Sequence, residues 1–304
     1  MDRLLTIFTP TYNRAYTLPK LYHSLCRQTD DNFEWLIIDD ASSDDTEDLI
    51  RHWQEDKSKF LIRYYKQEHG GKHRAINKGV KLAQGDFFFI VDSDDVLSDD
   101  AVKQVNVWAD MVRKDPGIAA VSGLRVSKEG KVWGGFPQIS NEYIDASGFE
   151  RRKYGLEGDK AEIYKTEVLR KFQFPEFEDE YFMTEDVCWL NIAAAGYKIR
   201  WYNRPIYICE YLEDGLTNSG ANTMEGHRKN YRGYCFYISE CMSKKPFVQK
   251  MIHIREYDRT ARSLKKSMTQ RSKDINMSVF GYCISVFCGV PVGYVFRKLL
   301  YKGG

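Results

Sequence analysis

The first hundred residues alternate short apolar runs with amphipathic stretches, and this rhythm limits the fold more than any other feature of the sequence. Four apolar runs are expected to form buried strands, at residues 4–8, 33–38, 60–65 and 87–91. Between them, apolar residues recur at the spacing of a helix face. A β-α-β-α order of this kind predicts a mostly parallel sheet flanked by helices, with right-handed crossovers. Ligands of such sheets bind at the carboxyl ends of the strands.

The rhythm breaks after about residue 115, and residues 125–160 show no clear periodicity. The elements expected beyond this point are a strand at 117–123, a helix from Thr184 to Gly196 and strands at 199–202 and 206–211. The chain after Asn218 is polar and basic and predicts helices. We therefore expect one α/β domain in two halves, 1–115 and 116–220, followed by a helical extension at 221–304.

Composition excludes several classes of protein. The 304 residues are enough to bury a sizeable core, and the formal net charge of +2 provides no basic field for nucleic acid. The seven cysteines are scattered and form no C-x-x-C pair, which argues against a disulfide framework or a zinc site. A reducing cytoplasm is the compartment that this favours. The apolar run at 4–8 is too short for the core of a signal peptide.

A cluster of acidic residues, Asp92-Ser93-Asp94-Asp95, directly follows the apolar run at 87–91. Three carboxylates in four residues repel one another unless a cation neutralises them. Oxygen ligands suit a hard divalent cation, Mg²⁺ or Mn²⁺, which usually takes one or two carboxylates and completes its shell with phosphates. The alternative is a solvated acidic turn that caps the helix expected at 99–113.

A second acidic cluster, Asp39 to Thr46, follows the second expected strand. Asp44 could cap the next helix, which explains the later half of the cluster. That explanation does not cover Asp39 and Asp40, which come directly after a buried strand. A carboxylate in that position can accept a hydrogen bond from a nucleobase, for example from N3–H of uracil.

Two loops could complete a nucleotide site. In Thr9–Arg14, Tyr12 could pack on a base or ribose and Arg14 could face a phosphate. In His69–His73, two glycines would let the backbone approach a ligand, and Lys72 could meet a phosphate as a point charge. Neither loop has the spacing of a P-loop or of the G-x-G-x-x-G motif.

The acidic pair Glu185-Asp186 stands at the start of an expected helix, after Thr184. Considered alone, Thr184 would be a helix N-cap and the two acids would be first-turn residues favoured by the helix dipole.

In combination these motifs are more specific. The order T-P-T-Y-N-R, D-D-A-S-S-D-D-T, D-S-D-D and E-D resembles the family 2 glycosyltransferases of the GT-A fold, over about residues 4–215. The resemblance is to members of the surface-polysaccharide, O-antigen and capsule type. It implies a Rossmann-like α/β domain with a mostly parallel central sheet, here with a C-terminal helical extension, and a hexosyltransferase activity.

The resemblance also implies roles for single residues. Asp186 would be the catalytic base, and Asp94 with Asp92 would bind Mn²⁺ or Mg²⁺. Asp40 would read the nucleobase. The residues implied to contact the nucleotide are Pro10, Thr11, Tyr12, Arg14, Asp40, Lys72, Asn77, Asp92 and Ser93. Candidate contacts to the acceptor or donor sugar are Glu185, Trp133, Trp189 and Trp201, with core packing as the alternative for each tryptophan.

The reaction implied is a single in-line displacement that inverts the anomeric configuration. The donor would be a nucleotide sugar, with UDP favoured, and the acceptor a hydroxyl of a glycan or lipid-linked glycan. The segment 210–217 resembles a loop that follows the catalytic region in polysaccharide-assembly members. The chain lacks the Q-x-x-R-W motif and the multiple membrane helices of processive synthases. The resemblance therefore favours addition of one sugar per encounter.

The C-terminal segment from Ile275 to Phe296 contains no charged residue and is flanked by Lys and Arg on both sides. Its length suffices to span a bilayer, which takes about 20 apolar residues. However, Gly289-Val290-Pro291 should break a helix. We expect two short helices that lie on the membrane surface through residues 275–302, so that the protein is peripheral on the cytoplasmic face. The alternatives are a helix packed on the domain and a membrane span.

Two other functions are compatible with acids after strands. A sugar-nucleotide pyrophosphorylase would carry a G-x-G-T-R loop near its N-terminus, and residues 9–14 contain no glycine. A non-catalytic nucleotide-binding module would need neither the chain beyond residue 120 nor the pair Glu185-Asp186.

Overall fold

The computed structural model describes residues 5–56, 58–135, 137, 139, 141–209, 220–241 and 244–300, without the side chains of 241 and 290–300. The chain divides into two compact units, Met1–Phe174 with Asn191–Leu212 and Pro175–Leu190 with Glu213–Gly304. Residues 175–190 thus group with the C-terminal helices, although the sequence predicts that they belong to the second half of the α/β domain. The functional division at residues 115 and 220 stays a prediction.

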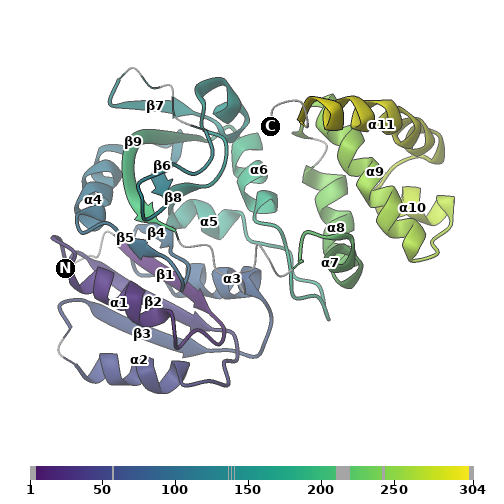
Figure 1. Ribbon diagram of the computed structural model, residues 1–304. Coiled ribbons are helices and arrows are strands. Elements are labelled where there is room, and N and C mark those ends of the chain that lie inside the picture. The colour runs from purple at the N-terminus through teal and green to yellow at the C-terminus, as the bar shows by residue number, and fades with distance from the viewer. Residues whose placement is uncertain are drawn as a thin grey trace. The chain divides into compact units, whose positions relative to one another are not determined.

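The first unit is built on one nine-stranded sheet (Figure 1). Its strands are β1 (Leu5–Thr11), β2 (Phe33–Asp39), β3 (Leu61–Lys66), β4 (Phe87–Ile90), β5 (Val96–Leu97), β6 (Ile118–Val126), β7 (Tyr143–Ala146), β8 (Lys160–Lys165) and β9 (Lys198–Ile208). They lie in the order β3-β2-β1-β4-β8-β6-β9-β5, and β7 pairs with β9. The strands β1 to β4 pair in parallel, whereas β8 runs antiparallel to β4 and β6. The predicted α/β fold is confirmed.

Helices pack against this sheet (Figure 1). They are α1 (Leu18–Cys26), α2 (Thr46–Glu55), α3 (Lys72–Leu82), α4 (Ala101–Val112), the 3₁₀ helix η1 (Gly148–Tyr154) and α5 (Thr166–Lys171). The helix α6 (Asp186–Ala194) runs across the boundary between the two units in sequence. Every residue of β2 and β4 is buried, as expected for strands covered on both faces.

Aromatic side chains fill much of the core between sheet and helices. The ring of Tyr22 on α1 stacks on that of Trp53 on α2 with centroids 4.3 Å apart, and Trp53 stacks in turn on Trp35 of β2. A second stacked pair joins Trp108 of α4 to Tyr202 of β9 at 4.1 Å. Burial of each large apolar side chain contributes about 1.5–3 kcal/mol, so these contacts fix the helices on the sheet.

The region that had no clear periodicity, 125–160, contains β7, η1 and the start of β8. Its strand β8 is hard to recognise because both terminal residues, Lys160 and Lys165, are buried lysines. The Lys160 ammonium donates to the backbone carbonyl of Glu157 at 2.7 Å, and burial lowers its pKa to about 8. The sequence pattern predicts that these lysines are exposed, but they are buried and their ammonium groups donate hydrogen bonds to backbone carbonyl oxygens.

The expected pair of strands at 199–202 and 206–211 is wrong as far as the structure describes them, because β9 runs without a break from Lys198 to Ile208. It pairs in parallel with β6 through a register shift near Leu124, where Pro205 is accommodated. Proline lacks a backbone donor and is tolerated in a sheet at such an irregularity. Residues 210 and 211 lie outside the described residues.

The second unit consists of helices: α7 (Met224–Lys229), α8 (Tyr231–Phe236), the π-helical turn η2 (Tyr237–Cys241), α9 (Phe247–Ser263), α10 (Met268–Asp274) and α11 (Val279–Leu300). A buried carboxylate, Asp258 on α9, ties three of them together. It accepts hydrogen bonds from Arg271 of α10 and from the hydroxyl of Tyr282 of α11, at 2.6 Å for the latter. The helices predicted after Asn218 are therefore present, and they share a polar centre.

The expected break at Gly289-Val290-Pro291 is wrong, because α11 is one continuous helix of 22 residues. A Cβ atom on Gly289 would lie 2.7 Å from the backbone oxygen of Met251, so glycine permits α11 to pack closely on α9. This packing holds the helix together where local propensity would end it. Among the described residues, no helix is both long and apolar enough to be a candidate membrane span.

Candidate functional site

The polar clusters of the first unit come together at one edge of the sheet. Because β1, β2 and β4 are parallel neighbours, their carboxyl ends point the same way. The backbone N–H of Asp40 donates to the carbonyl of Thr11 at 2.9 Å. This bond joins the cluster Asp39–Thr46 to the loop Thr9–Arg14. The hydroxyl of Thr11 is buried and has no hydrogen-bond partner among the described residues. These clusters therefore lie at one edge of the sheet.

The loops after β1 and β2 support each other. Asn13, which has a positive φ of 52°, donates its backbone N–H to the hydroxyl of Ser42 at 2.8 Å. Its side-chain oxygen accepts from the backbone of Ser43 at 2.8 Å. Asp44 accepts from Ala15 and from the hydroxyl of Thr46, at 2.6 Å for the hydroxyl. These bonds give the later half of the acidic cluster a structural role.

Asp40 is 5% exposed, and its carboxylate holds the loop that leads into α3. One oxygen accepts from the backbone of Gly70 and from the side chain of Gln67, both at 2.8 Å. The other oxygen accepts from the backbone of Gly71 at 2.8 Å and lies 2.9 Å from Nδ1 of His69. Four protein groups thus surround the carboxylate that the resemblance assigns to the nucleobase.

The side chains expected around a base are only partly covered. Tyr12 is 48% exposed, and its ring lies 4.8 Å from that of His69. Arg14 is half-buried and lies beside the ring of Tyr16, and Pro10 is half-buried at the end of β1. This edge therefore offers aromatic and cationic side chains to a ligand.

Asp92 lies next to Lys72, the first residue of α3. The two side chains form an ion pair with Nζ 2.7 Å from Oδ1, and the backbone N–H of Asp92 donates to the hydroxyl of Tyr207. Burial alone would raise the pKa of Asp92, but the charges of Lys72 and Arg125 lower it below its ordinary value. Ser93 is buried beside it. Lys72, from the loop 69–73, therefore pairs with the acidic cluster Asp92–Asp95, a contact that the sequence pattern did not predict.

Asp94 and Asp95 are crowded with Asp92, and their surroundings disfavour the ionised form of both carboxyl groups. Burial, followed by the charge of Asp92, raises the pKa of Asp94. The same two causes raise the pKa of Asp95 to about 8, although the hydroxyl of Tyr207 donates to it at 2.8 Å. Clustered carboxylates of this kind are relieved by a cation.

A divalent cation fits this chemistry. Mg²⁺ or Mn²⁺ usually binds one or two carboxylates and fills the remaining positions with water and phosphate oxygens, and Asp92 and Asp94 could supply the carboxylates. In the described part of the chain, no three His, Cys, Asp or Glu side chains converge to hold a metal ion.

One cation of this site, Arg125 on β6, was missed by the sequence interpretation. Its guanidinium lies over the ring of Tyr207 at 4.2 Å, and its Nε is buried without a hydrogen-bond partner among the described residues. Burial would lower the pKa of Arg125, but the electrostatic effects of Tyr207 and Asp92 raise it overall. The only signal in the sequence was a single arginine in an otherwise uncharged strand.

Some predicted site residues have other roles in the structure. Asn77 was expected to contact the nucleotide; it is instead buried, and its side-chain amide exchanges two hydrogen bonds of 2.9 Å with the backbone of Phe174. Trp201 is a core residue whose indole N–H donates to the carbonyl of Ala146. Trp133 and Trp189 are half-buried, which is compatible with either role expected for them.

In the second unit, Asp186 is the first residue of α6. Its carboxylate forms an ion pair with Lys245, Nζ to Oδ2 2.8 Å, and lies 3.5 Å from the hydroxyl of Tyr237. Burial would lower the pKa of Lys245, but Asp186 and Tyr237 raise it overall. Glu185, the neighbour of Asp186, is half-buried. Lys245 was not recognised in the sequence, because it lies 59 residues further along the chain.

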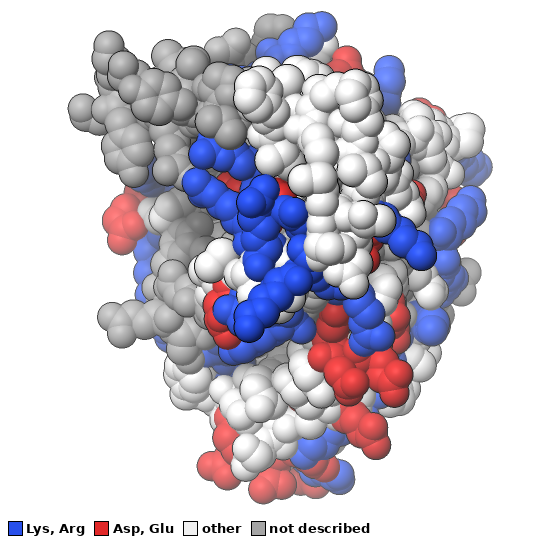
Figure 2. All heavy atoms as spheres, turned by 90° about the vertical axis from the view of Figure 1, so that its right-hand side faces the viewer, with Lys and Arg blue, Asp and Glu red and all other residues white. Residues whose placement is uncertain are grey.

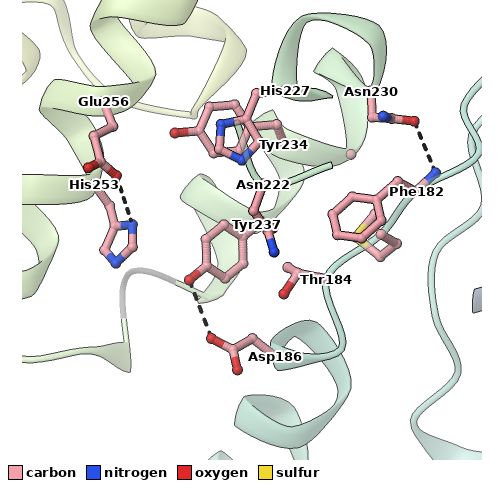
Figure 3. A pocket seen from close by; sticks show the side chains of 12 residues that line it. Phe182, Thr184, Asp186, Asn222, His227, Asn230, Tyr234, Tyr237, His253 and Glu256 are labelled. Carbon is pink, nitrogen blue, oxygen red and sulfur yellow. Dashed lines mark hydrogen bonds and ion pairs between the residues drawn. The ribbon is translucent and has the colours of Figure 1, made fainter. Parts of the chain in front are cut away.

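Asp186 also lines a cavity of about 330 Å³ within the second unit (Figure 3). Figure 3 shows the cavity between the segment that carries Thr184 and Asp186 and the helices that carry Tyr234, Tyr237 and His253. The residue predicted to be the catalytic base therefore lines a cavity and is not part of the packed core.

A parallel sheet that gathers acids, a lysine and exposed aromatic groups at its carboxyl edge has the build of an α/β enzyme that binds nucleotides. Residues 6–171 match the profile of Glycosyl transferase family 2. This match covers more than half of the chain, so the chain belongs to that family and is a glycosyltransferase.

Two curated relatives have similar sequences. GalNAc(5)-diNAcBac-PP-undecaprenol beta-1,3-glucosyltransferase of Campylobacter jejuni is 29% identical over 77% of this chain and 72% of its own length. Poly-beta-1,6-N-acetyl-D-glucosamine synthase of Staphylococcus aureus is 27% identical over 68% of this chain and 50% of its own length.

Solved structures share the fold. TarS of S. aureus in complex with UDP-GlcNAc superposes with a TM-score of 0.60 at 19% identity, over 93% of this chain and 81% of that chain. The mannosyltransferase PcManGT of Pyrobaculum calidifontis, with GDP-Man and Mn²⁺, superposes with a TM-score of 0.53 at 17% identity, over 98% and 79%. At these identities the likeness is one of fold, and it confirms the GT-A architecture.

Proposed function

We propose that this glycosyltransferase transfers one sugar per encounter from a nucleoside-diphosphate donor, with UDP favoured, to a hydroxyl of a glycan or lipid-linked glycan. We further propose that the transfer inverts the anomeric carbon and depends on Mn²⁺ or Mg²⁺. The observation that carries the proposal is the acidic cluster Asp92, Asp94 and Asp95 at the end of β4, with Lys72 paired to its first member. The name of the structural neighbour with GDP-Man and Mn²⁺ is consistent with a metal.

The nucleotide would bind along the edge formed by the ends of β1, β2 and β4. Tyr12 offers an exposed ring for the base or ribose, and Arg14 and Lys72 offer positive charge to the diphosphate. Thr11, the last residue of β1, is also a proposed contact, although its hydroxyl is buried among protein atoms in the described structure. Pro10 and Ser93 complete the proposed contacts.

Contact between the base and Asp40 requires an exchange of partners. Two of the four groups around its carboxylate, Gln67 and His69, are side chains that can rotate away. A base N–H would then take the place of one of them. The two backbone donors from the glycine loop would stay, so Asp40 would both position this loop and read the base.

A divalent cation on Asp92 and Asp94 would neutralise the charge that grows on the diphosphate leaving group. Asp92 would then have to share its carboxylate between the cation and Lys72, which lies 2.7 Å away. Lys72 could then turn toward the phosphates. Both positive charges would favour the same step, departure of the nucleoside diphosphate.

Asp186 would act as the base. In one displacement it takes the proton of the acceptor hydroxyl while that oxygen bonds to the anomeric carbon, and the bond from this carbon to the diphosphate breaks. The ion pair with Lys245 holds the carboxylate of Asp186 in place before the acceptor arrives. Glu185, Trp133 and Trp189 remain proposed contacts to the acceptor or donor sugar.

The acceptor is proposed to lie at a membrane, on the cytoplasmic face. The name of the Campylobacter jejuni relative specifies an undecaprenol-linked substrate. On α11, Phe280 and Phe287 are 77% and 80% exposed, and Ile284 between them is also exposed. Exposed basic residues occur on the neighbouring α9 and α10. Figure 2 shows Lys and Arg side chains gathered near the middle of the face that it presents. Apolar and basic groups together suit an anionic lipid surface.

The activity can be tested with a panel of UDP, GDP and dTDP sugars in the presence of Mn²⁺. Release of a nucleoside diphosphate from one donor class, abolished by a chelator, would support the proposal. Turnover that requires pyrophosphate would show a pyrophosphorylase instead. Tight binding without release, in the presence of membrane extracts that contain glycan acceptors, would show a non-catalytic binding module.

A further inference from the structure

In the described structure, the carboxylate of Asp186 is held through one of its two oxygens. Its Oδ2 accepts a hydrogen bond from the ammonium of Lys245 at 2.8 Å and lies 3.5 Å from the hydroxyl of Tyr237. Its Oδ1 accepts no hydrogen bond from any of the described residues. The two oxygens of this acid therefore have different surroundings.

The two groups that contact Oδ2 also contact each other. The ammonium of Lys245 donates to the hydroxyl of Tyr237 at 2.9 Å and lies 5.4 Å from the centre of its ring. Figure 3 shows the hydroxyl of Tyr237 directed toward the carboxylate of Asp186. The Lys245–Tyr237 pair thus forms a connected support on one side of this carboxylate.

This pair is more firmly placed than the acid that it contacts. Tyr237 is buried at the start of the π-helical turn η2, and its ring meets His253 of α9 edge to face at 6.0 Å. The side chain of Lys245 is 16% exposed, whereas that of Asp186 is 49% exposed. Single π-helical turns occur frequently at functional sites. The structure therefore provides a buried support for a carboxylate whose other side is open.

The charges around Asp186 point to the same contact. Burial would lower the pKa of Lys245, but Asp186 and Tyr237 raise it overall, so the ammonium stays charged near pH 7. The neighbouring His253 does not compete for the carboxylate, because burial, followed by the charge of Lys245, lowers its pKa to about 4. The orientation of the carboxylate therefore depends on Lys245.

A general base needs an oxygen that is available and directed at the proton that it takes. The terminal torsion of an Asp side chain has a broad energy minimum, so an unsupported carboxylate can present its oxygens in many directions. A misplacement of about 1 Å in a reacting group can lower a rate about 10²-fold. Contacts to Oδ2 restrict this rotation and leave Oδ1 available.

We propose that Lys245 and Tyr237 are positioning residues for the base: they hold Oδ2 of Asp186 and leave Oδ1 as the atom that takes the proton. The proposal rests on the proposed function, because it takes Asp186 as the base. It adds that two residues outside the segment 6–171, which matches the family profile, are needed for the rate of transfer but not for binding of the donor.

The first test measures release of nucleoside diphosphate from the UDP, GDP and dTDP sugars, with Mn²⁺ and a membrane extract that contains glycan acceptors. Lys245→Met should lower kcat about 10- to 100-fold and leave the KM for the donor within about twofold of wild type. Lys245→Arg should be faster than Lys245→Met, because it keeps a positive charge beside Oδ2. Tyr237→Phe should lower kcat about three- to tenfold, as for the loss of one hydrogen bond.

The control is Lys250→Met, at a half-buried lysine of α9 that pairs with none of the described acids, and it should behave like wild type. A second test does not depend on turnover. Acetylation of Lys245 near neutral pH, followed by mass spectrometry, should be several-fold faster in Asp186→Asn than in wild type. The amine then loses the charge that raises its pKa, while the burial that lowers the pKa remains.

Three results would overturn this inference and leave the proposed function intact. The first is wild-type turnover by Lys245→Met in a protein that Asp186→Asn impairs. The second is a raised donor KM in Lys245→Met without any advantage of Lys245→Arg, which would give Lys245 a structural role. The third is equal acetylation of Lys245 in wild type and in Asp186→Asn. A wild type that releases no nucleoside diphosphate from any donor would instead remove the proposed function, and this inference with it.

Discussion

Asp186 illustrates how the surroundings of a residue change its interpretation. The sequence alone predicts only an acidic residue in the first turn of a helix, a position that the helix dipole favours. In the structure its carboxylate faces a cavity and is paired with Lys245. The ion pair fixes the position of the carboxylate, which in the proposed mechanism accepts the proton of the acceptor hydroxyl.

Replacement of Asp186 with Asn should lower sugar transfer about 10²–10⁴-fold, the usual contribution of a general base. The amide keeps the size of the side chain but cannot take the proton. Donor affinity, measured by calorimetry with Mn²⁺, should stay within about twofold of wild type. Glu225→Gln, at an exposed acid on α7 of the same unit, is the matched control. Near-normal turnover of Asp186→Asn with intact donor binding would remove Asp186 from the mechanism.

His253 gives the second unit a defined response to acid. The charged groups around it are Lys245, Asp186, Glu256 and His227. Burial, then Lys245, lowers its pKa from 6.5 to about 4, so the unfolded chain binds a proton more readily than the folded one. Stability should therefore rise with pH between about 4 and 6.5 and should be lost on acidification through this window.

His253→Gln should remove this part of the pH dependence. We expect about 1–2 kcal/mol of the stability change between pH 6.5 and 4.5 to disappear, discounted because the side chain is 31% exposed. Urea unfolding at a series of pH values measures it, with the exposed His52→Gln on α2 as control. An unchanged pH profile would show that His253 titrates normally.

Most of the residues proposed to contact the nucleotide lie at the ends of strands, as the sequence predicts, because they follow the strands directly along the chain. What could not be predicted is which of their polar atoms the protein itself uses. The side-chain amide of Asn77 forms hydrogen bonds with the backbone of Phe174, and the carboxylate of Asp40 accepts hydrogen bonds from the backbone of Gly70 and Gly71. Arg125 and Lys245 were missed because only tertiary contacts bring them to Asp92 and Asp186.

At the scale of elements, α3 shows how closely the helices approach the sheet. Gly79 faces β1, and a Cβ atom there would lie 2.3 Å from the ring of Phe8. Glycine in mid-helix costs helix propensity, but here it lets α3 carry Lys72 to the site edge.

Gly79→Ala should therefore destabilise the first unit by about 1–3 kcal/mol, the usual effect of overpacking, although alanine is the better helix former. Denaturant unfolding measures the change, and Lys81→Ala, at an exposed position of α3, is the control. A change of less than about 0.5 kcal/mol in Gly79→Ala would mean that the helix shifts freely on the sheet.

The first four strands and the helices between them were predictable because the apolar runs of the strands and the helical spacing of apolar residues are both uninterrupted in the sequence. Later elements were not, for reasons particular to each. The strand β8 contains lysines, which suggest an exposed segment, but their ammonium groups are buried and donate hydrogen bonds to backbone oxygens. The strand β9 continues through Pro205, because a register shift accommodates the proline. In α11 the packing of Gly289 against α9 outweighs a local signal for a break.

At the scale of the whole molecule, the chain combines an α/β unit, which carries the proposed nucleotide site, with a helical unit that carries Asp186 and exposed phenylalanines. We expect the double variant Phe280→Ser/Phe287→Ser to bind vesicles of phosphatidylglycerol several-fold more weakly than wild type in sedimentation. Its thermal midpoint should not fall, since both side chains are largely exposed. Val107→Ser/Met111→Ser, an exposed apolar pair on α4, should bind vesicles like wild type. Equal binding by all three proteins would contradict the membrane proposal.

The most direct measurement is a thermal-shift titration of nucleoside diphosphates with and without Mn²⁺, on wild type and on Asp94→Asn. We predict that one nucleotide stabilises wild type only when Mn²⁺ is present, and that Asp94→Asn loses this stabilisation while Asp110→Asn, an exposed acid on α4, keeps it. Equal stabilisation without metal, or in Asp94→Asn, would contradict a nucleotide site built on a metal-binding pair of aspartates.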